Sequence, residues 1–386
     1  GWSGMTCPVV VVRGSARERG RSYGEQARDR IHLSIEAYGR IFAHYAHWDW
    51  ARVTEEARRY VPAIEAFDAS QLAEMEGVAE GAGVALDDIL AINVRTEIMF
   101  AAKARAFDAT LPRFAECSAF AAVGDDGTTY VGENWDWATH AFDTVIRLES
   151  YPDDGPAFVT VVEAGLLCKF GMNDAGLGLA CNALVSSLDA GEPGVPFHVM
   201  LRALIGARTP VEAFEILQRR SRSSSANYLV AHASGLAMDF ECEAGDSTHI
   251  SLIGPDDRGV ILHTNHFLAP IRGTDVGLWN FPDSPFRLQR LERALRLSTN
   301  HVTPPSWFVD SAQDHAAHPY GICCHPDALL PREEQGATVA STVMNVSHGT
   351  MALWDGNPCT APRIDIDYAK LWSASPAEQA LGGGTA

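Results

Sequence analysis

The chain has 386 residues, of which 46% are hydrophobic, so it can build one large layered domain with a sizeable core. Its formal net charge of −19 argues against a nucleic-acid partner, because phosphate binding requires clustered Lys and Arg. No uninterrupted apolar stretch of about 18 residues occurs, so we expect no membrane span. The early apolar run at 9–12 is too short for a signal peptide, and we expect a cytoplasmic protein.

Three further features of the sequence give no information about function. Eight cysteines in a chain of this length do not make a disulfide framework. Residues 1–4, which precede Met5, are interpreted as a cloning remnant and excluded from the fold. Lysine occurs only at positions 103, 169 and 370, which we attribute to the codon bias of a GC-rich bacterial genome.

The first third of the chain is predicted to be mostly helical. Val9 to Arg13 forms a short strand, and from Arg19 to Tyr45 apolar residues recur every three or four positions, which predicts one long amphipathic helix. Helical patterns continue at 54–67, 70–80 and 86–98. The segment 111–114 then breaks the pattern with a proline, and we expect it to be exposed and mobile.

After this segment the pattern changes to strands. Residues 118–123 and 128–132 flank Gly124-Asp125-Asp126-Gly127, which is typical of a hairpin turn. Further strands are predicted at 158–162, 169–172, 177–181, 227–232, 237–243, 260–264, 338–346 and 350–354, and helices at 197–205, 211–219 and 286–297. Helices, strands, helices and strands in this order favour a layered α+β protein, with two antiparallel sheets between helical layers.

Cys117 opens the first strand of this second region. If the bond between Glu116 and Cys117 breaks, Cys117 carries both a thiol and a free α-amine. The amine can then act as the base that activates its own nucleophile. An α-amine titrates at about 7.7–8.0 and a thiol at about 8.5, so such a thiol is usable near neutral pH. The competing interpretation is a buried strand cysteine without chemistry.

Short motifs along nearly the whole chain carry a family resemblance. They include Arg13-Gly14-Ser15, Asn93-Val94-Arg95-Thr96-Glu97, Cys117-Ser118-Ala119-Phe120, Gly132-Glu133-Asn134-Trp135-Asp136, His263-Thr264-Asn265-His266-Phe267, Asp314-His315, Ile322-Cys323 and Gly356-Asn357-Pro358-Cys359. In order and spacing the chain resembles the acyl-CoA:6-aminopenicillanate acyltransferase-like branch of the N-terminal-nucleophile (Ntn) hydrolases.

The resemblance implies a fold, a maturation step and three catalytic residues. The fold is the four-layer αββα sandwich, and self-cleavage before Cys117 gives an α chain, 1–116, and a β chain, 117–386, which remain one domain. Cys117 is then the nucleophile, and Asp136 orients or charges its new α-amine and assists cleavage. Asn265 supplies the oxyanion hole. The family uses no metal, and we expect no cofactor.

Other residues receive weaker interpretations. Asn134, Arg95 and His266 are candidate pocket residues. For Arg95 with Glu97 we favour a surface ion pair, and for His263 and His266 a structural or pocket-wall role.

Two groups near the C-terminus receive no role. Thr338 and Ser341 fall where the family carries a hydroxyl implicated in processing. A zinc site built from His315, His318, Cys323, Cys324 and His325 is rejected, because the spacing fits no common structural site and adjacent cysteines are awkward for tetrahedral ligation.

These observations predict an enzyme that acts on a small-molecule acyl amide or thioester through a thioester acyl-enzyme. Hydrolysis is favoured, because no segment is recognisable as a coenzyme A nucleotide site. The alternatives are an acyl-CoA-dependent N-acyltransferase of a natural-product amine, an uncleaved non-catalytic binding protein, and an uncleaved hydrolase that pairs Cys117 with His263 or His266. Substrate identity and homo-oligomer formation stay open.

Overall fold

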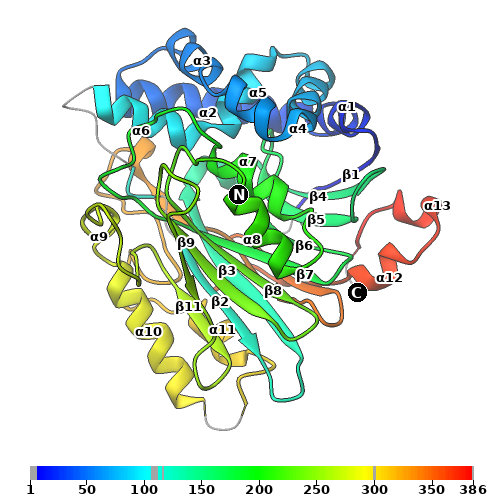
Figure 1. The fold of residues 1–386 in the computed structure, drawn as a ribbon, viewed down its shortest axis with the longest axis vertical. Helices are drawn as coiled ribbons and strands as arrows, with labels where there is room; N and C mark the ends of the chain where they lie inside the picture. The colour runs from blue at the N-terminus through cyan, green and yellow to red at the C-terminus, as the bar shows by residue number, and fades with distance from the viewer. Residues whose placement is uncertain (1–6, 106–111, 115–116, 299–300, 385–386) are drawn as a thin grey trace.

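The computed structural model describes residues 7–105, 112–114, 117–298 and 301–384. The remnant-like residues 1–4 and Glu116 of the predicted cleavage bond lie outside this range. Within it, two β-sheets pack face to face, and helices cover their outer faces and one end (Figure 1). The predicted four-layer αββα arrangement is confirmed.

The two sheets contain different numbers of strands, and only the first includes a parallel pair among the described residues. The first, in spatial order, contains β1 (Val9–Gly14), β4 (Val145–Pro152), β5 (Phe158–Glu163), β6 (Phe170–Asn173), β7 (Leu177–Ala183), β8 (Ala226–His232), β9 (Ala237–Cys242) and β10 (Ile250–Ile253). The second contains β11 (Val260–His263), β2 (Cys117–Val123), β3 (Thr129–Ala138), β12 (Gly336–Asn345), β13 (Thr350–Asp355) and β14 (Arg363–Asp367). All pairs are antiparallel except β1 with β4, which is parallel at the edge of the first sheet.

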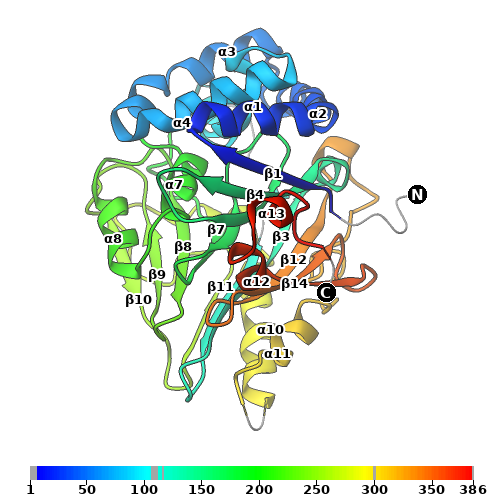
Figure 2. The ribbon, with the colours of Figure 1, turned by 90° about the vertical axis from the view of Figure 1, so that its right-hand side faces the viewer.

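The sheets meet where β2 and β3 pack against β7 and β8. Trp135 of β3 is fully buried between them, with its ring 6.1 Å from that of Phe170 on β6. The first sheet is covered by α7 (Phe197–Leu204) and α8 (Pro210–Gln218), and the second by α10 (Ser284–Leu297) and α11 (Ser306–Ser311), as Figure 2 shows from the side.

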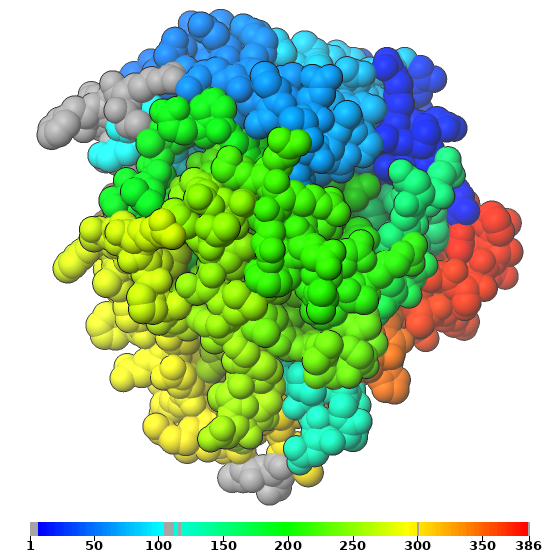
Figure 3. Space-filling model, in the orientation of Figure 1, coloured from blue at the N-terminus to red at the C-terminus, as the bar shows by residue number. Residues whose placement is uncertain are grey.

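Six N-terminal helices cover one end of both sheets, as the blue and cyan surface in Figure 3 shows. They are α1 (Ala16–Gln26), α2 (Arg28–Ala46), α3 (Trp50–Arg58), α4 (Val61–Ala82), α5 (Leu86–Asn93) and α6 (Arg95–Arg105). Their apolar faces join the same core cluster as the sheets, so residues on both sides of Cys117 share one core. In the described part of the chain, no helix is both long and apolar enough to cross a membrane.

Short elements complete the fold. They are the single-turn helices α9 (Gly277–Asn280), α12 (Tyr368–Trp372) and α13 (Pro376–Gln379) and the 3-10 turns at Thr139–Asp143 and Arg332–Glu334. Local capping explains several helix starts. Ser15 and Glu18 form a capping box at α1, and Thr209 accepts the backbone N–H of Glu212 at α8.

The prediction of one helix from Arg19 to Tyr45 is wrong in one respect. The chain leaves helical geometry at Ala27 (φ −105°, ψ 15°), so α1 and α2 are separate helices. The apolar spacing continues across the break, so periodicity alone does not show where one helix ends and the next begins.

The prediction for 111–114 is also wrong where it can be checked. Pro112 and Phe114 are buried, and the Phe114 ring packs edge-on against Trp137 with centroids 5.0 Å apart. Sequence reasoning also missed strands β4, β10 and β14 and helix α11, although β14 shows a strict alternation of apolar and charged residues.

Four glycines allow α1 and α4 to approach until their backbones touch. A Cβ at Gly20 would lie 2.1 Å from the Glu74 carbonyl oxygen, and one at Gly24 2.2 Å from that of Val78. Gly77 and Gly81 meet α1 in the same way, with a Cβ 2.4 and 2.1 Å from the carbonyl oxygens of Arg17 and Arg21. The crossing therefore has no room for any side chain.

Gly20→Ala is expected to destabilise the protein by about 1–3 kcal/mol or more, because two backbones must separate. Gly39→Ala is the matched control, since Gly39 lies inside α2 with nothing within 4 Å of the added carbon. That change should stabilise by up to about 1 kcal/mol through helix propensity. Denaturant unfolding measures both, and equal effects of the two changes would contradict the packing argument.

Candidate active site

Cys117 is the first residue of β2 and pairs with Trp135 of β3. Its side chain is only 3% exposed and hydrogen-bonds the Glu133 carboxyl. Burial raises the pKa of the Cys117 thiol well above its usual range, with Glu133 adding to the rise and Lys169 opposing it. In the unbroken chain the thiol is therefore protonated at neutral pH and is a poor nucleophile.

Three side chains hold the backbone groups of Cys117. Its N–H donates to Asn265 Oδ1 at 2.8 Å. Its carbonyl oxygen accepts from Arg287 Nη1 at 2.8 Å and from Asn182 Nδ2 at 3.3 Å. The sequence predicted that Asn265 acts together with Cys117, and the structure brings these two residues into contact.

Arg287 is the centre of this arrangement, and sequence reasoning missed it. It lies on α10, is 2% exposed, and forms a buried ion pair with Asp283 at 2.8 Å. It also donates to Ser118 Oγ and to Asn265 Oδ1, each at 2.9 Å. Its only sequence signal was an arginine one turn after an aspartate near the start of the predicted helix at 286–297.

The orientation of Asn265 follows from its neighbours. Two donors, Cys117 N–H and Arg287, face one end of the amide, so that end must be oxygen. The Nδ2 group donates to the Ala183 carbonyl oxygen at 2.9 Å. A primary amide nitrogen carries two hydrogens, so one donor remains beyond the bond to Ala183.

Asp136 lies one residue after Trp135, the strand partner of Cys117, and is 1% exposed. Its Oδ1 accepts from Thr338 Oγ1 at 2.6 Å, while Oδ2 has no hydrogen-bond partner among the described residues. Burial raises the pKa of Asp136 to about 8, although Arg287 and the Thr338 hydroxyl oppose the rise. Such a group can carry a proton near neutral pH.

Glu133 and Lys169 form a second polar pair beside the thiol that the sequence did not single out. Glu133 Oε1 accepts the Cys181 N–H at 3.1 Å, and burial raises the pKa of Glu133 to about 7, against the opposing charge of Lys169. Lys169 is 4% exposed, and its ammonium lies 4.9 Å from the Phe197 ring centre. Strand alternation placed Glu133 on the same face as Trp135, which was a usable signal of a buried acid.

A largely apolar cavity opens beside Cys117. Its polar lining consists of Arg95, Thr96, Asp136, Lys169 and Ser225, and its apolar lining of Met99, Phe100, Pro112, Trp135, Trp137, Ala183, Leu184, Val185, Phe197 and Phe281. Pro112 comes from the segment that leads to Cys117, so residues on both sides of this cysteine form the cavity wall.

Arg95 and Glu97 do not form the expected surface ion pair. Both are buried, and Arg95 pairs with Glu163 at 2.9 Å and stacks on Trp137 at 3.8 Å. Burial alone would raise the pKa of Glu163, but Arg95 and His140 hold it at about 2. Glu97 instead accepts from Ser224 Oγ at 2.6 Å, and burial raises its pKa to about 7. The sequence suggested exposed side chains because Arg95 and Glu97 are charged. Their burial depends on Glu163, a partner 68 positions away from Arg95 that no nearby residue indicates.

The other candidate residues lie apart from the thiol. Asn134 is satisfied by Ser341 and by two carbonyl oxygens, and it does not line the cavity as described. Both ring nitrogens of His263 are engaged, by Glu241 at 2.6 Å and by the Thr264 carbonyl at 2.8 Å. His266 bonds Ser284 at 2.7 Å, and burial lowers its pKa to about 4. These contacts give no support to a Cys–His pair.

The four-layer αββα sandwich, with a cysteine at the start of a central strand of the second sheet, defines the Ntn-hydrolase class of fold. The sequence profile of the family described as acyl-coenzyme A:6-aminopenicillanic acid acyl-transferase matches residues 123–358. The chain belongs to this family, and it is an enzyme.

Three individual proteins to which the chain is similar share between 14% and 26% sequence identity with it. The chain is 26% identical to the acyl-coenzyme A:6-aminopenicillanic-acid-acyltransferase 40 kDa form of Emericella nidulans over 341 residues, which is 87% of this chain and 88% of the relative. Among solved structures, an N-acylethanolamine-hydrolyzing acid amidase ortholog of Caenorhabditis elegans aligns with a TM-score of 0.45 at 14% identity, covering 60% of this chain and 93% of that one. Penicillin V acylase from Agrobacterium tumefaciens aligns with a TM-score of 0.39 at 14% identity, covering 66% and 87%. These two likenesses are too low to assign any residue.

Arg287→Met is expected to destabilise the protein by about 1–3 kcal/mol, because it removes the buried guanidinium that bonds Asp283 and the Cys117 carbonyl, while Arg113 at 3.1 Å still pairs with Asp283. Arg293→Met, on the exposed side of the same helix, is the control and should stay within about 0.5 kcal/mol of wild type. Denaturant unfolding at neutral pH measures both. Equal, small effects would show that the Arg287 network does not stabilise the site.

Proposed function

We propose that the chain is an autoprocessed N-terminal-cysteine enzyme that hydrolyses a small-molecule amide. One observation carries the proposal: the backbone nitrogen of Cys117 is held by Asn265 at 2.8 Å, with the thiol of the same residue buried at the cavity. A fixed nitrogen beside a reactive sulfur is what a nucleophile with its own amine base requires.

Self-cleavage would proceed through the thiol. Cys117 Sγ attacks the carbonyl carbon of residue 116, the C–N bond breaks, and the acyl group moves from nitrogen to sulfur as a thioester. The departing nitrogen gains a proton from Asp136 and becomes the α-amine of Cys117, and the proton that the thiol loses on attack restores the one on Asp136. Water then hydrolyses the thioester, which leaves a carboxylate on Glu116 and a free thiol on Cys117.

Asp136 is the proposed proton donor in that step. Its pKa of about 8 keeps it largely protonated at neutral pH, and a general acid works best when its pKa is near the working pH. After cleavage, the unpartnered Oδ2 would accept a hydrogen bond from the new α-amine, which supplies the partner that this buried atom lacks.

In turnover, the α-amine would take the thiol proton while Sγ attacks the acyl carbonyl of the substrate. Asn265 Oδ1 would keep the amine in place, and the second Nδ2 hydrogen would donate to the developing oxyanion. The protonated amine then gives its proton to the leaving amine, and water hydrolyses the resulting thioester.

The cavity supports an apolar acyl group. Its aromatic and aliphatic walls favour a hydrophobic acyl chain or ring, and the described lining offers Lys169, Arg95 and Ser225 as the polar groups that could orient an amide. Transfer of the acyl group from a coenzyme A thioester to an amine of a natural product is the second candidate. It is favoured by the matched family's description.

Association of the two chains is part of this proposal. The α chain, 1–116, would stay bound to the β chain, 117–386, because helices α1–α6 contribute to the same apolar core as the sheets. A cytoplasmic location, a bacterial origin and a homo-oligomeric state remain sequence-based predictions.

Intact-mass measurement of the purified protein is expected to give two fragments that join between Glu116 and Cys117. Cys117→Ala should leave one chain and abolish turnover of acyl amides and acyl-CoA thioesters, because both the nucleophile and the new amine depend on this residue. Cys242→Ala, a buried cysteine on β9, is the control and should cleave and turn over normally. Product analysis with and without an added amine separates hydrolysis from transfer.

Two results would contradict this proposal. One is turnover that persists in Cys117→Ala. The other is a fully active wild type that remains a single unbroken chain, which would favour a hydrolase without cleavage. An unbroken chain that turns over no substrate of either class would favour a binding protein.

The stability of the uncleaved Cys117→Ala protein should depend on pH through Asp136. The pKa of this carboxyl is raised from 3.8 to about 8 by burial, so the folded state holds a proton that the unfolded state releases, and stability falls as pH rises between these values. Adding Asp136→Asn removes the titrating carboxyl and with it this pH-dependent contribution to stability. The double variant should therefore gain stability relative to Cys117→Ala by up to about 1.4 kcal/mol per pH unit from pH 4 to 8. A difference that stays constant over this range, measured by denaturant unfolding, would refute the assignment.

A further inference from the structure

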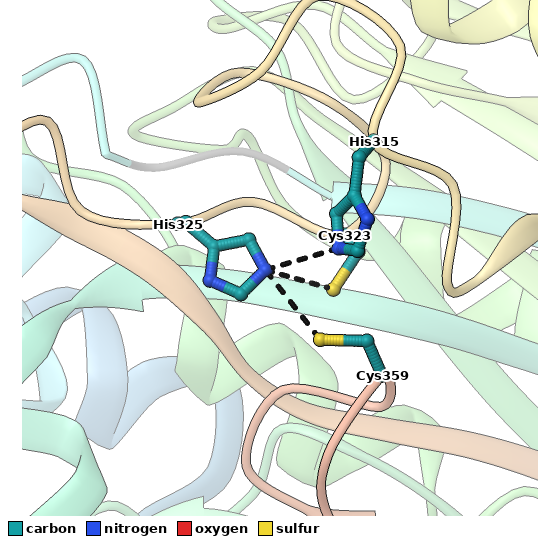
Figure 4. A group of neighbouring side chains, drawn as sticks. All are labelled: His315, Cys323, His325 and Cys359. Atoms are coloured by element: carbon teal, nitrogen blue, oxygen red, sulfur yellow. Dashed lines mark hydrogen bonds between the residues drawn. The ribbon is translucent and has the colours of Figure 1, made fainter.

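Two histidines and two cysteines meet where the loop after α11 lies beside the turn between β13 and β14. The Nε2 atoms of His315 and His325 and the Sγ atoms of Cys323 and Cys359 each offer one ligand atom, and all four lie within 4.8 Å of one another (Figure 4). The first three residues come from the loop after α11, and Cys359 comes from the turn between β13 and β14.

The separations match those around a tetrahedral metal ion. With Zn–N of about 2.0–2.1 Å and Zn–S of about 2.3 Å, neighbouring ligands lie about 3.3 Å apart for two nitrogens and about 3.6 Å for nitrogen and sulfur. From His325 Nε2, the His315 nitrogen lies at 3.1 Å, the Cys323 sulfur at 3.6 Å and the Cys359 sulfur at 3.5 Å. Since all ligand atoms already lie within 4.8 Å, the remaining pairs need to close by at most about 1 Å.

We propose that His315, Cys323, His325 and Cys359 bind a zinc ion in a Cys₂His₂ structural site. Two thiolates and two imidazoles are a ligand set that zinc prefers. Four protein ligands fill the tetrahedron and leave no position for water or substrate, so the site is structural and not catalytic. Zinc binding itself requires neither the proposed cleavage nor the Cys117 thiol.

Neighbouring groups support the sulfur ligands. Asn357 Nδ2 lies 3.7 Å from Cys323 Sγ and also donates to the Cys324 carbonyl at 2.8 Å. The Cys359 backbone N–H hydrogen-bonds the Cys323 side chain. Such N–H donors to a thiolate are typical of the outer contacts of a metal site.

Sequence reasoning rejected a zinc site because it paired Cys323 with its neighbour Cys324 and did not include Cys359. Cys324 Sγ turns away, 3.9 Å from the Gly336 carbonyl oxygen, so the adjacent cysteines do not compete for one ion. The missing ligand is Cys359, which comes from a separate turn 34 positions after His325. A ligand set divided between two loops has no regular spacing.

A zinc ion at this site would hold in place the loop after α11, which contacts strand β3. The Ile322 carbonyl oxygen, next to Cys323, accepts from Asn134 Nδ2 at 3.1 Å. The Cys324 backbone N–H donates to Thr338 Oγ1 at 2.8 Å, and Thr338 in turn holds Asp136. Binding zinc would therefore fix this loop against β3 and β12, and removing it would loosen the support of Asp136.

Metal analysis of the full-length protein tests the proposal. Protein prepared without a histidine tag is loaded with Zn²⁺, freed of excess metal and measured by elemental mass spectrometry, and we expect about one zinc per chain. His315→Ala and Cys359→Ala should each weaken zinc binding by about 100-fold or more in a chelator competition, since losing even an outer contact costs about 10–100-fold. Cys324→Ala is the matched control and should bind like wild type.

Cobalt replacement gives a second readout that does not depend on turnover. Co²⁺ in the wild type should show the intense visible bands of a tetrahedral site and thiolate charge-transfer absorption, and Cys359→Ala should lose intensity in both. His315 is exposed, so its replacement leaves the core intact and keeps the test valid if a cysteine variant folds poorly.

Three outcomes would overturn the proposal. The loaded protein could hold no stoichiometric metal, the His315→Ala and Cys359→Ala proteins could bind zinc as tightly as wild type, or peptide mapping could find a Cys323–Cys359 disulfide in protein kept under reducing conditions.

Discussion

The site depends on one buried cation. Arg287 lies on α10 and donates hydrogen bonds to the carbonyl of Cys117, the side chain of Ser118 and the amide oxygen of Asn265. A guanidinium has five N–H donors in a fixed plane, so it can hold several acceptors at set positions. Its charge is compensated by Asp283, four residues earlier on the same helix, so the cost of burying it is reduced locally.

Burial and the presence or absence of a close cation explain why the carboxyl groups around Cys117 differ in protonation. Asp136 and Glu133 are buried with few donors, and burial raises the pKa of both, to about 8 and about 7. Glu163 is equally buried but faces Arg95 and His140, which hold its pKa at about 2. Asp136 and Glu133, which keep a proton near neutral pH, therefore lie next to the cysteine. The ionised Glu163 instead holds Arg95, which lines the cavity.

Two supports of the β3 strand come from opposite sides. On one side, helices α1–α6 and the Arg95–Glu163 pair pack around Trp137. On the other, the loop that carries His315, Cys323 and His325 presents carbonyl oxygens to Asn134 and a backbone N–H to Thr338. The rigidity of the strand that bears Asp136 thus depends on segments distant in the sequence, as is usual for a preorganised site.

The sequence by itself determined the layered α+β class and most strands and helices, because periodicity and turn residues are local signals. The link between Cys117 and Asn265 came from the family resemblance of the motifs that contain them, and the structure brings the two residues into contact. Only the tertiary structure decided which charges are buried and which partners they find. Arg287, Glu163 and Cys359 reach the residues they serve from remote elements, and a side chain's burial and pKa depend on everything packed around it, which no spacing along the chain encodes.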